Sequence, residues 1–117
     1  MLRFNCQRMN LGYKEIGELM KYHPKIKGIF RGSWFLDPNL EQVTPELEYL
    51  RTIPQNNGAI LFQGGTTHHE INESLAFSPH RRKLYKEGKY IPAVYAYIWP
   101  RKEFLEWLSQ TDVEQMF

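Results

Sequence analysis

The sequence has very little cysteine and no long hydrophobic segment. Cys6 is the single cysteine among 117 residues, so an intrachain disulfide is excluded, which is consistent with a reducing compartment. No apolar run approaches the ~20 residues that a membrane-spanning helix needs. The first five residues, 1–5, lack the apolar centre of a secretory signal peptide. We therefore expect a cytoplasmic protein that has no membrane anchor.

A strong charge imbalance is also missing. The chain has 15 Lys and Arg against 13 Asp and Glu, a formal net charge of +2, which does not by itself indicate a nucleic-acid partner. The hydrophobic fraction of 42% and the aromatic fraction of 15% are instead typical of a folded domain. We predict one domain over residues 1–117, with poorly ordered tails at 1–9 and 110–117.

Recognised catalytic and metal-binding motifs are absent. The sequence contains no phosphate-binding glycine loop, no Gly-x-Ser-x-Gly turn and no convincing Ser/His/Asp order. The run His68-His69-Glu70 has residue types that bind metals, but its spacing matches no zinc signature, and a site needs three or four converging ligands. We predict no metal site and interpret this run as part of a polar loop.

Hydrophobic periodicity and turn signals predict a small α/β domain. The order α-β-α-β-(α)-β-α gives a short mixed sheet of three or more strands with helices packed on it. Because strands alternate with helices, at least one strand pair is expected to be parallel. Segment 66–72 is predicted to be a loop, and segment 73–77 is compatible with a strand fragment or a helical turn. The predicted helices cover residues 10–22, 45–53, 79–87 and 100–109, and the predicted strands cover 28–36, 59–63 and 90–99.

The longest apolar run, from Gly28 to Pro38, is predicted to contain the central strand, with both faces covered. Gly28 and Gly32 indicate a bulge or a close approach of other backbone. The strand at 59–63 is expected to be buried as well. In the first helix, Asn10 is the expected N-cap, and the buried stripe is expected to comprise Ile16, Leu19 and Met20.

Two predicted helices begin with cations, although helix N-termini prefer acidic residues because their free N–H groups and dipole are positive. The helix after Thr44-Pro45 follows the rule, and the helices after Ser78-Pro79 and at Pro100 do not. An anion bound there would meet N–H groups, the dipole and guanidinium groups together. The alternative is a solvated or glutamate-paired surface. The predicted ligand-binding residues, including two tryptophans as walls, are Ser78, His80, Arg81, Arg82, Arg101, Lys102, Trp34 and Trp99.

Two further side chains have open roles. Asp37 follows the apolar run directly and could act as a catalytic base, although the Asp-Pro-Asn sequence favours a turn residue that bonds its own backbone. Arg31, if it points inward, is expected to pair with Asp37 or a glutamate, and otherwise it is expected to face water. The aromatic residues of the C-terminal third could stack on a ligand's base or simply form the core.

Two segments carry a family resemblance. Ser33-Trp34-Phe35-Leu36-Asp37-Pro38-Asn39-Leu40 is similar to a Ser-Trp-Leu-Leu-Asp-Pro-x-Leu pattern in bacterial proteins that have a GNAT-like, acyltransferase-related C-terminal domain. Ser78 with Arg81, followed by Gly88-Lys89-Tyr90, is similar to a second segment of these proteins. The stretch 28–107 also resembles uncharacterised bacterial proteins that carry Ser-Trp-Phe-x-Asp-Pro and Ile-Trp-Pro-Arg.

The resemblance implies part of a GNAT fold and a ligand related to CoA. The family's pyrophosphate-binding loop has no counterpart here, because the corresponding helix begins Thr44-Pro45-Glu46, so the cofactor stays unassigned.

Two hypotheses follow from the sequence. In the first, an acyltransferase-related domain binds a phosphate- or carboxylate-bearing ligand at the two basic helix starts, with Asp37 as the catalytic candidate if the protein is an enzyme. In the second, a non-enzymatic module binds a protein chain, or less favourably a nucleic acid, through its basic and aromatic C-terminal surface. The first hypothesis expects that replacing Arg81 and Arg101 by alanine abolishes ligand-induced stabilisation and leaves the fold intact.

Overall fold

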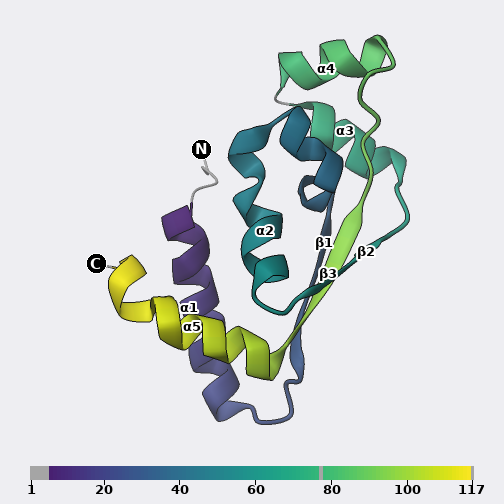
Figure 1. The fold of residues 1–117 in the computed structure, drawn as a ribbon. Coiled ribbons are helices and arrows are strands. Elements are labelled where there is room, and N and C mark those ends of the chain that lie inside the picture. The colour runs from purple at the N-terminus through teal and green to yellow at the C-terminus, as the bar shows by residue number, and fades with distance from the viewer. Residues whose placement is uncertain (1–5, 77, 117) are drawn as a thin grey trace.

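The computed structural model describes residues 6–76 and 78–116. Within them the chain forms a small mixed α/β domain, which confirms the predicted fold class (Figure 1). Three short 3-10 segments connect the first strand to the second α-helix. The elements are α1 (Cys6–Tyr22), β1 (Gly28–Ser33), η1 (Trp34–Leu36), η2 (Pro38–Gln42), η3 (Pro45–Leu47), α2 (Tyr49–Asn56), β2 (Ile60–Gln63), α3 (His68–Ala76), α4 (Pro79–Lys86), β3 (Tyr95–Pro100) and α5 (Arg101–Met116).

The described sheet has three strands in the order β1-β3-β2, and both pairs are antiparallel. The prediction of a parallel pair is therefore wrong, and β3, not β1, is the central strand. Strands β1 and β2 run in the same direction, because each is antiparallel to β3. The crossover through α2 joins them, but β3 is inserted between them, as in a split β-α-β unit.

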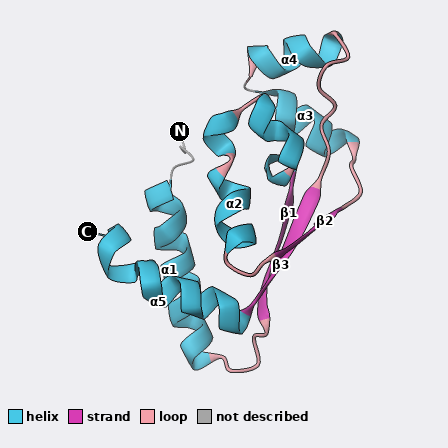
Figure 2. Cartoon of the chain, viewed as in Figure 1, coloured by secondary structure: helices cyan, strands magenta, loops and turns pink. Residues whose placement is uncertain are grey.

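Helices cover one face of this sheet. Figure 2 shows α1, α2 and α5 gathered on one side of the strands, with α3 and α4 beyond one end. The main core lies between these three helices and the covered face, and it is unusually aromatic. The Tyr13 ring stands edge-on to Trp99, Phe104 and Trp107 at centroid distances of 5.4–5.6 Å. These buried aromatic residues, together with Tyr97, favour core packing for most of the C-terminal aromatic cluster.

The first helix begins four residues earlier than the predicted cap, at Cys6, so Asn10 lies inside it and is buried. Its buried face contains Tyr13, Gly17 and Met20, whereas Leu19 is 52% exposed. The predicted stripe was therefore wrong at Leu19. Gly17 lets α1 approach α5 closely, because a Cβ there would lie 2.3 Å from Leu108 Cδ2. Helix α1 includes residues 6–9, and α5 includes residues 110–116.

The strand over 28–36 is shorter than predicted, because β1 ends at Ser33 and the chain turns into η1. The expected close approach of backbone is confirmed at Gly28, where a Cβ would lie 2.4 Å from the Trp99 carbonyl oxygen. Pro54 lies inside α2 and does not end it. Segment 66–72 is not a loop throughout, since α3 begins at His68. Its start is fixed by the Glu70 carboxylate, which accepts a hydrogen bond from the Thr67 N–H at 3.2 Å.

Local turn and cap signals agree with the structure at the third predicted helix. The Ser78 hydroxyl caps α4 by accepting a hydrogen bond from the Arg81 N–H at 3.1 Å. Gly88 follows the helix with a φ of 73°, in the left-handed region that glycine adopts at low cost. The Asn57-Gly58 turn is confirmed as well, with a φ of 101° at Gly58. These features place the cationic residues of α4 where the sequence predicts them.

Candidate functional site

The Arg81 side chain turns from the start of α4 into the protein, where it is 8% exposed. Its Nε donates to the Ser74 carbonyl at 2.6 Å, and its Nη1 donates to the Thr44 hydroxyl at 3.0 Å. The guanidinium carbon also lies 4.8 Å from the centre of the Trp34 ring, in a cation–π contact. Burial lowers the pKa of Arg81, and nearby Tyr90 and Glu46 oppose this shift. This guanidinium group therefore joins η1, Thr44 and α3, and contacts protein on several sides.

Arg82 and Arg101 donate hydrogen bonds to carbonyl groups at the C-terminal ends of other helices. Arg82 Nη1 donates to the carbonyls of Leu75 and Ala76, at 2.8 and 3.0 Å, at the end of α3. Arg101 donates to three carbonyls at and just after the end of α1: Met20, His23 and Ile26, at 2.8, 3.1 and 3.0 Å.

This arrangement explains the anomaly in the sequence. A cation near the N-terminus of one helix is unfavourable for that helix, but it satisfies free carbonyls and complements the dipole where another helix ends. The start of α4 caps α3, and the start of α5 caps α1.

The two basic helix starts do not meet. In the β1–β3 register Gly28 lies opposite Pro100, and Ser33 lies opposite Tyr95. The start of α5 is therefore at one end of the sheet, and α4, which carries Arg81, lies beyond the other end (Figure 1).

The structure brings together only part of the predicted ligand set. Ser78, Arg81 and Trp34 form one group with Arg82 nearby, whereas Arg101 lies apart, and His80 and Lys102 are exposed. Trp99 is 0% exposed in the main core, where its Nε1 donates to the Asn57 carbonyl at 2.9 Å. It does not form a surface wall.

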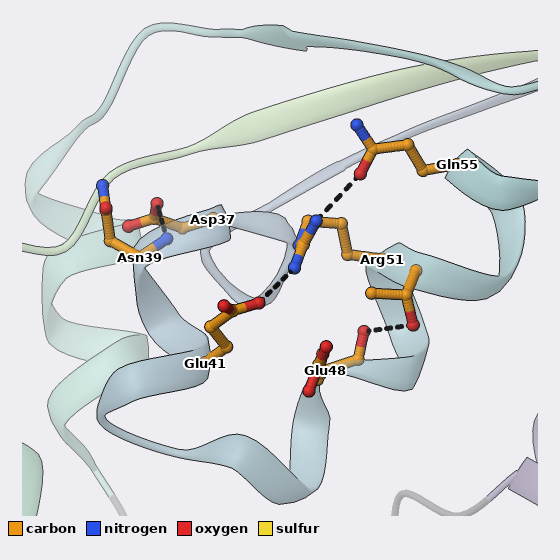
Figure 3. Close-up of polar contacts among 7 residues, drawn as sticks. Asp37, Asn39, Glu41, Glu48, Arg51 and Gln55 are labelled. Atoms are coloured by element: carbon orange, nitrogen blue, oxygen red, sulfur yellow. Dashed lines mark hydrogen bonds and ion pairs between the residues drawn. The ribbon is translucent and has the colours of Figure 1, made fainter.

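Asp37 is a turn residue in this fold. Its Oδ1 accepts a hydrogen bond from the Asn39 N–H at 2.9 Å and caps η2, which confirms the turn interpretation (Figure 3). The side chain is 2% exposed, and its Oδ2 has no hydrogen-bond partner among the described residues. Burial raises the pKa of Asp37, while the bonds from Asn39 and the charge of Arg51 oppose the shift. A catalytic base must reach a proton of its substrate, and this carboxyl is closed off from solvent.

Two further arginines, Arg51 and Arg31, also contact neighbouring side chains. Arg51 is held by Glu41 at 2.7 Å and by Gln55 at 2.8 Å, as Figure 3 shows. Arg31 lies with its guanidinium carbon 5.0 Å from the centre of the Phe35 ring. Among the described residues, this cation–π contact stands in place of the pairing with Asp37 or a glutamate that was expected if Arg31 pointed inward.

Two surface cavities lie away from the predicted anion-binding residues. A cavity of about 310 Å³ lies between α1 and α5, and another of about 300 Å³ lies beside Asn39 and Tyr90. Neither is lined by any of the six polar or charged residues predicted at the basic helix starts, or by Trp34 or Trp99. Neither of these two cavities is therefore a pocket for the predicted anion site.

The sheet face opposite the helices is open and apolar, a feature that the sequence interpretation missed. Phe30, Ile98 and Ile60 lie side by side across the three strands and are 68%, 46% and 62% exposed. Phe62 is 39% exposed on the same face. We call these four residues the open-face patch. Both β1 and β2 were predicted to be covered, so the structure corrects that prediction.

The open-face patch is built from two edge strands around a small central residue. The rings of Phe30 on β1 and Phe62 on β2 lie 6.3 Å apart between centroids, although β3 separates the two strands. Between these strands lies Ala96, which pairs with Phe62 and is only 4% exposed. The two rings therefore lean toward each other across β3 and leave their outer surfaces exposed.

Other candidate sites receive no support. Within residues 6–76 and 78–116, no group of three or more His, Cys, Asp or Glu could hold a metal ion, and no helix is long and apolar enough to span a membrane. His68 and His69 are exposed in α3, where His69 contacts Glu73 at 3.2 Å. Comparisons with protein-family models, curated proteins and solved structures found no match to this chain.

Proposed function

We propose that this protein is a non-enzymatic protein-binding domain, and that the open-face patch is its binding surface. The observation that carries the proposal is the composition of the open sheet face. Its eight outward strand positions contain no charged or polar side chain: Gly28, Phe30, Gly32, Ala96, Ile98, Pro100, Ile60 and Phe62. An exposed apolar patch of this kind is typical of an interaction site.

The size of the open-face patch is suited to the centre of an interface. Taking about 200 Å² for each fully exposed large side chain, the four residues expose roughly 400 Å². At about 25 cal/mol per Å², covering that area contributes about 10 kcal/mol before the costs of association. Those costs are of similar size, so a stable complex also needs a polar rim around the patch. The occupant that fits is a polypeptide with an apolar surface.

Anion binding and an acyltransferase-related origin remain predictions. The geometry supports them less, because Arg81, Arg82 and Arg101 already donate to protein oxygens. A nucleic acid is also less suited to the open-face patch, which lacks the cations that contact phosphates. The cytoplasmic location remains a prediction from the single cysteine.

The test combines affinity capture with reconstitution. Tagged wild-type protein and the Phe30→Lys variant are used to capture partners from cells that naturally contain the protein, with Tyr22→Lys as the control. Tyr22 is 79% exposed and lies on α1, outside the sheet. A captured protein is then purified and titrated by calorimetry.

We expect Phe30→Lys to weaken binding by about tenfold or more and Tyr22→Lys to leave it unchanged. Binding should also show a negative heat-capacity change from apolar burial. Unchanged affinity in both Phe30→Lys and Ile60→Lys would refute the proposed surface. Specific thermal stabilisation by CoA, a nucleotide or sulfate would instead favour the anion hypothesis.

A further inference from the structure

We infer that the partner of the open-face patch is a second copy of this chain, so that two sheets pack face to face about a two-fold axis. This inference rests on the proposed function, and it names the partner that the surface fits. Most homo-oligomers are dimers of this symmetry, in which the same patch lies on both sides of the contact.

The charge distribution favours a second copy. In a two-fold contact every charge near the axis faces its own copy, so a like-charge repulsion would appear wherever the patch carried a charge. The eight outward strand positions carry none. A different partner is commonly selected by complementary charges, and this surface offers no charge for such a partner to recognise.

The area is also what a small homodimer requires. Two copies of the open-face patch contribute roughly 800 Å² of apolar surface. Homodimer interfaces are about 65% apolar, and stable interfaces begin near about 1,200 Å² in total. The patch therefore supplies the apolar share of an interface at the lower end of this range, and polar groups at the margins supply the rest.

The test is the oligomeric state of the full chain, measured by sedimentation velocity and light scattering from about 1 to about 500 µM. We expect the wild type to shift with concentration toward twice the mass of one chain. Phe30→Lys should weaken the dimer by about tenfold or more, and the control Tyr22→Lys should keep it. Circular dichroism checks that each variant is folded, and Ile60→Lys repeats the test if Phe30→Lys is not.

A second arm separates a two-fold contact from other self-association. Phe30→Lys and Phe30→Asp should each dimerise at least about tenfold more weakly than the wild type, and mixing them should recover dimer because opposite charges then face each other. A wild type that stays monomeric throughout the range would overturn this inference, as would a dimer that Phe30→Lys and Ile60→Lys leave unchanged. A monomer that binds another purified protein through Phe30 would keep the proposed function and remove only the second copy.

Discussion

Replacing Arg81 by methionine tests whether this residue is a structural link or a ligand-binding residue. Methionine keeps much of the aliphatic length but removes the donors that reach the Ser74 carbonyl and the Thr44 hydroxyl. It also removes the cation over Trp34. A structural link therefore predicts a large loss of stability in the absence of any ligand.

The size of the effect follows from these contacts. A buried group left without its hydrogen-bond partner costs about 1–3 kcal/mol, and two groups lose theirs. The cation–π contact adds about 1 kcal/mol. Part of this loss is offset because a charge no longer has to be buried. We expect a net destabilisation of about 3 kcal/mol, which corresponds to a fall in Tm of roughly 10 °C.

Urea unfolding followed by circular dichroism measures this change, and Lys83→Met is the matched control because Lys83 is exposed on the same helix. A double-mutant cycle with Thr44→Val should give a coupling of about 1 kcal/mol between Arg81 and Thr44. A loss no larger than that of Lys83→Met would refute the structural role. The double alanine variant of Arg81 and Arg101 is likewise expected to be less stable, contrary to the expectation from the sequence.

Three further predictions concern other positions. Arg101→Met should lower the free energy of unfolding by about 2 kcal/mol and speed amide exchange in the last turn of α1, because it removes the bonds to the carbonyls there. The control Lys102→Met, at an exposed position, should change neither quantity. Unchanged exchange in Arg101→Met would contradict the capping role. Asp37→Asn should gain stability relative to wild type as pH rises above about 4, because the raised pKa of Asp37 means that the folded state holds its proton more tightly and that ionisation costs stability. Urea unfolding at several pH values measures this difference, and a difference that shrinks as pH rises would contradict the reasoning. Gly58→Ala should lower the free energy of unfolding, measured by thermal unfolding, by about 1–3 kcal/mol, because φ at Gly58 is 101° and an added Cβ would lie 2.6 Å from Glu103 Cγ. Gly65→Ala is the control, because nothing lies within 4 Å of the Cβ added there. Equal losses of stability in the two variants would contradict this account.

Features that depend on neighbours a few residues apart could be predicted from the sequence. The Ser78 cap, the turn at Asn57-Gly58 and the backbone bond of Asp37 all lie within three residues of their partners. One signal of this kind was missed. Thr67 followed three residues later by Glu70 is a capping-box spacing, and it marks the start of α3 in a segment predicted to be a loop.

Features that depend on distant partners could not be predicted. Arg101 looked like half of an anion site because its acceptors, at the end of α1, are about eighty residues away in the chain. Arg81 reaches Thr44 in the same way. The exposure of Phe30 could not be predicted either. The sequence pattern of an apolar strand is the same whether a helix or solvent covers its face, so the sheet order must be known first.

The position of β3 has a consequence for how the chain acquires its structure. The strand that pairs with both others is the last of the three to be synthesised, and it joins Gly28 to Pro100 and Ser33 to Tyr95. Until β3 has been synthesised, β1 and β2 have no strand to pair with in the sheet. The sheet therefore cannot assemble one hairpin at a time along the chain. The entropy of closing these long loops is lost before the pairing compensates for it. Sheet assembly should therefore be one late, slow event, during which both apolar edge strands stay open to association with other nascent chains.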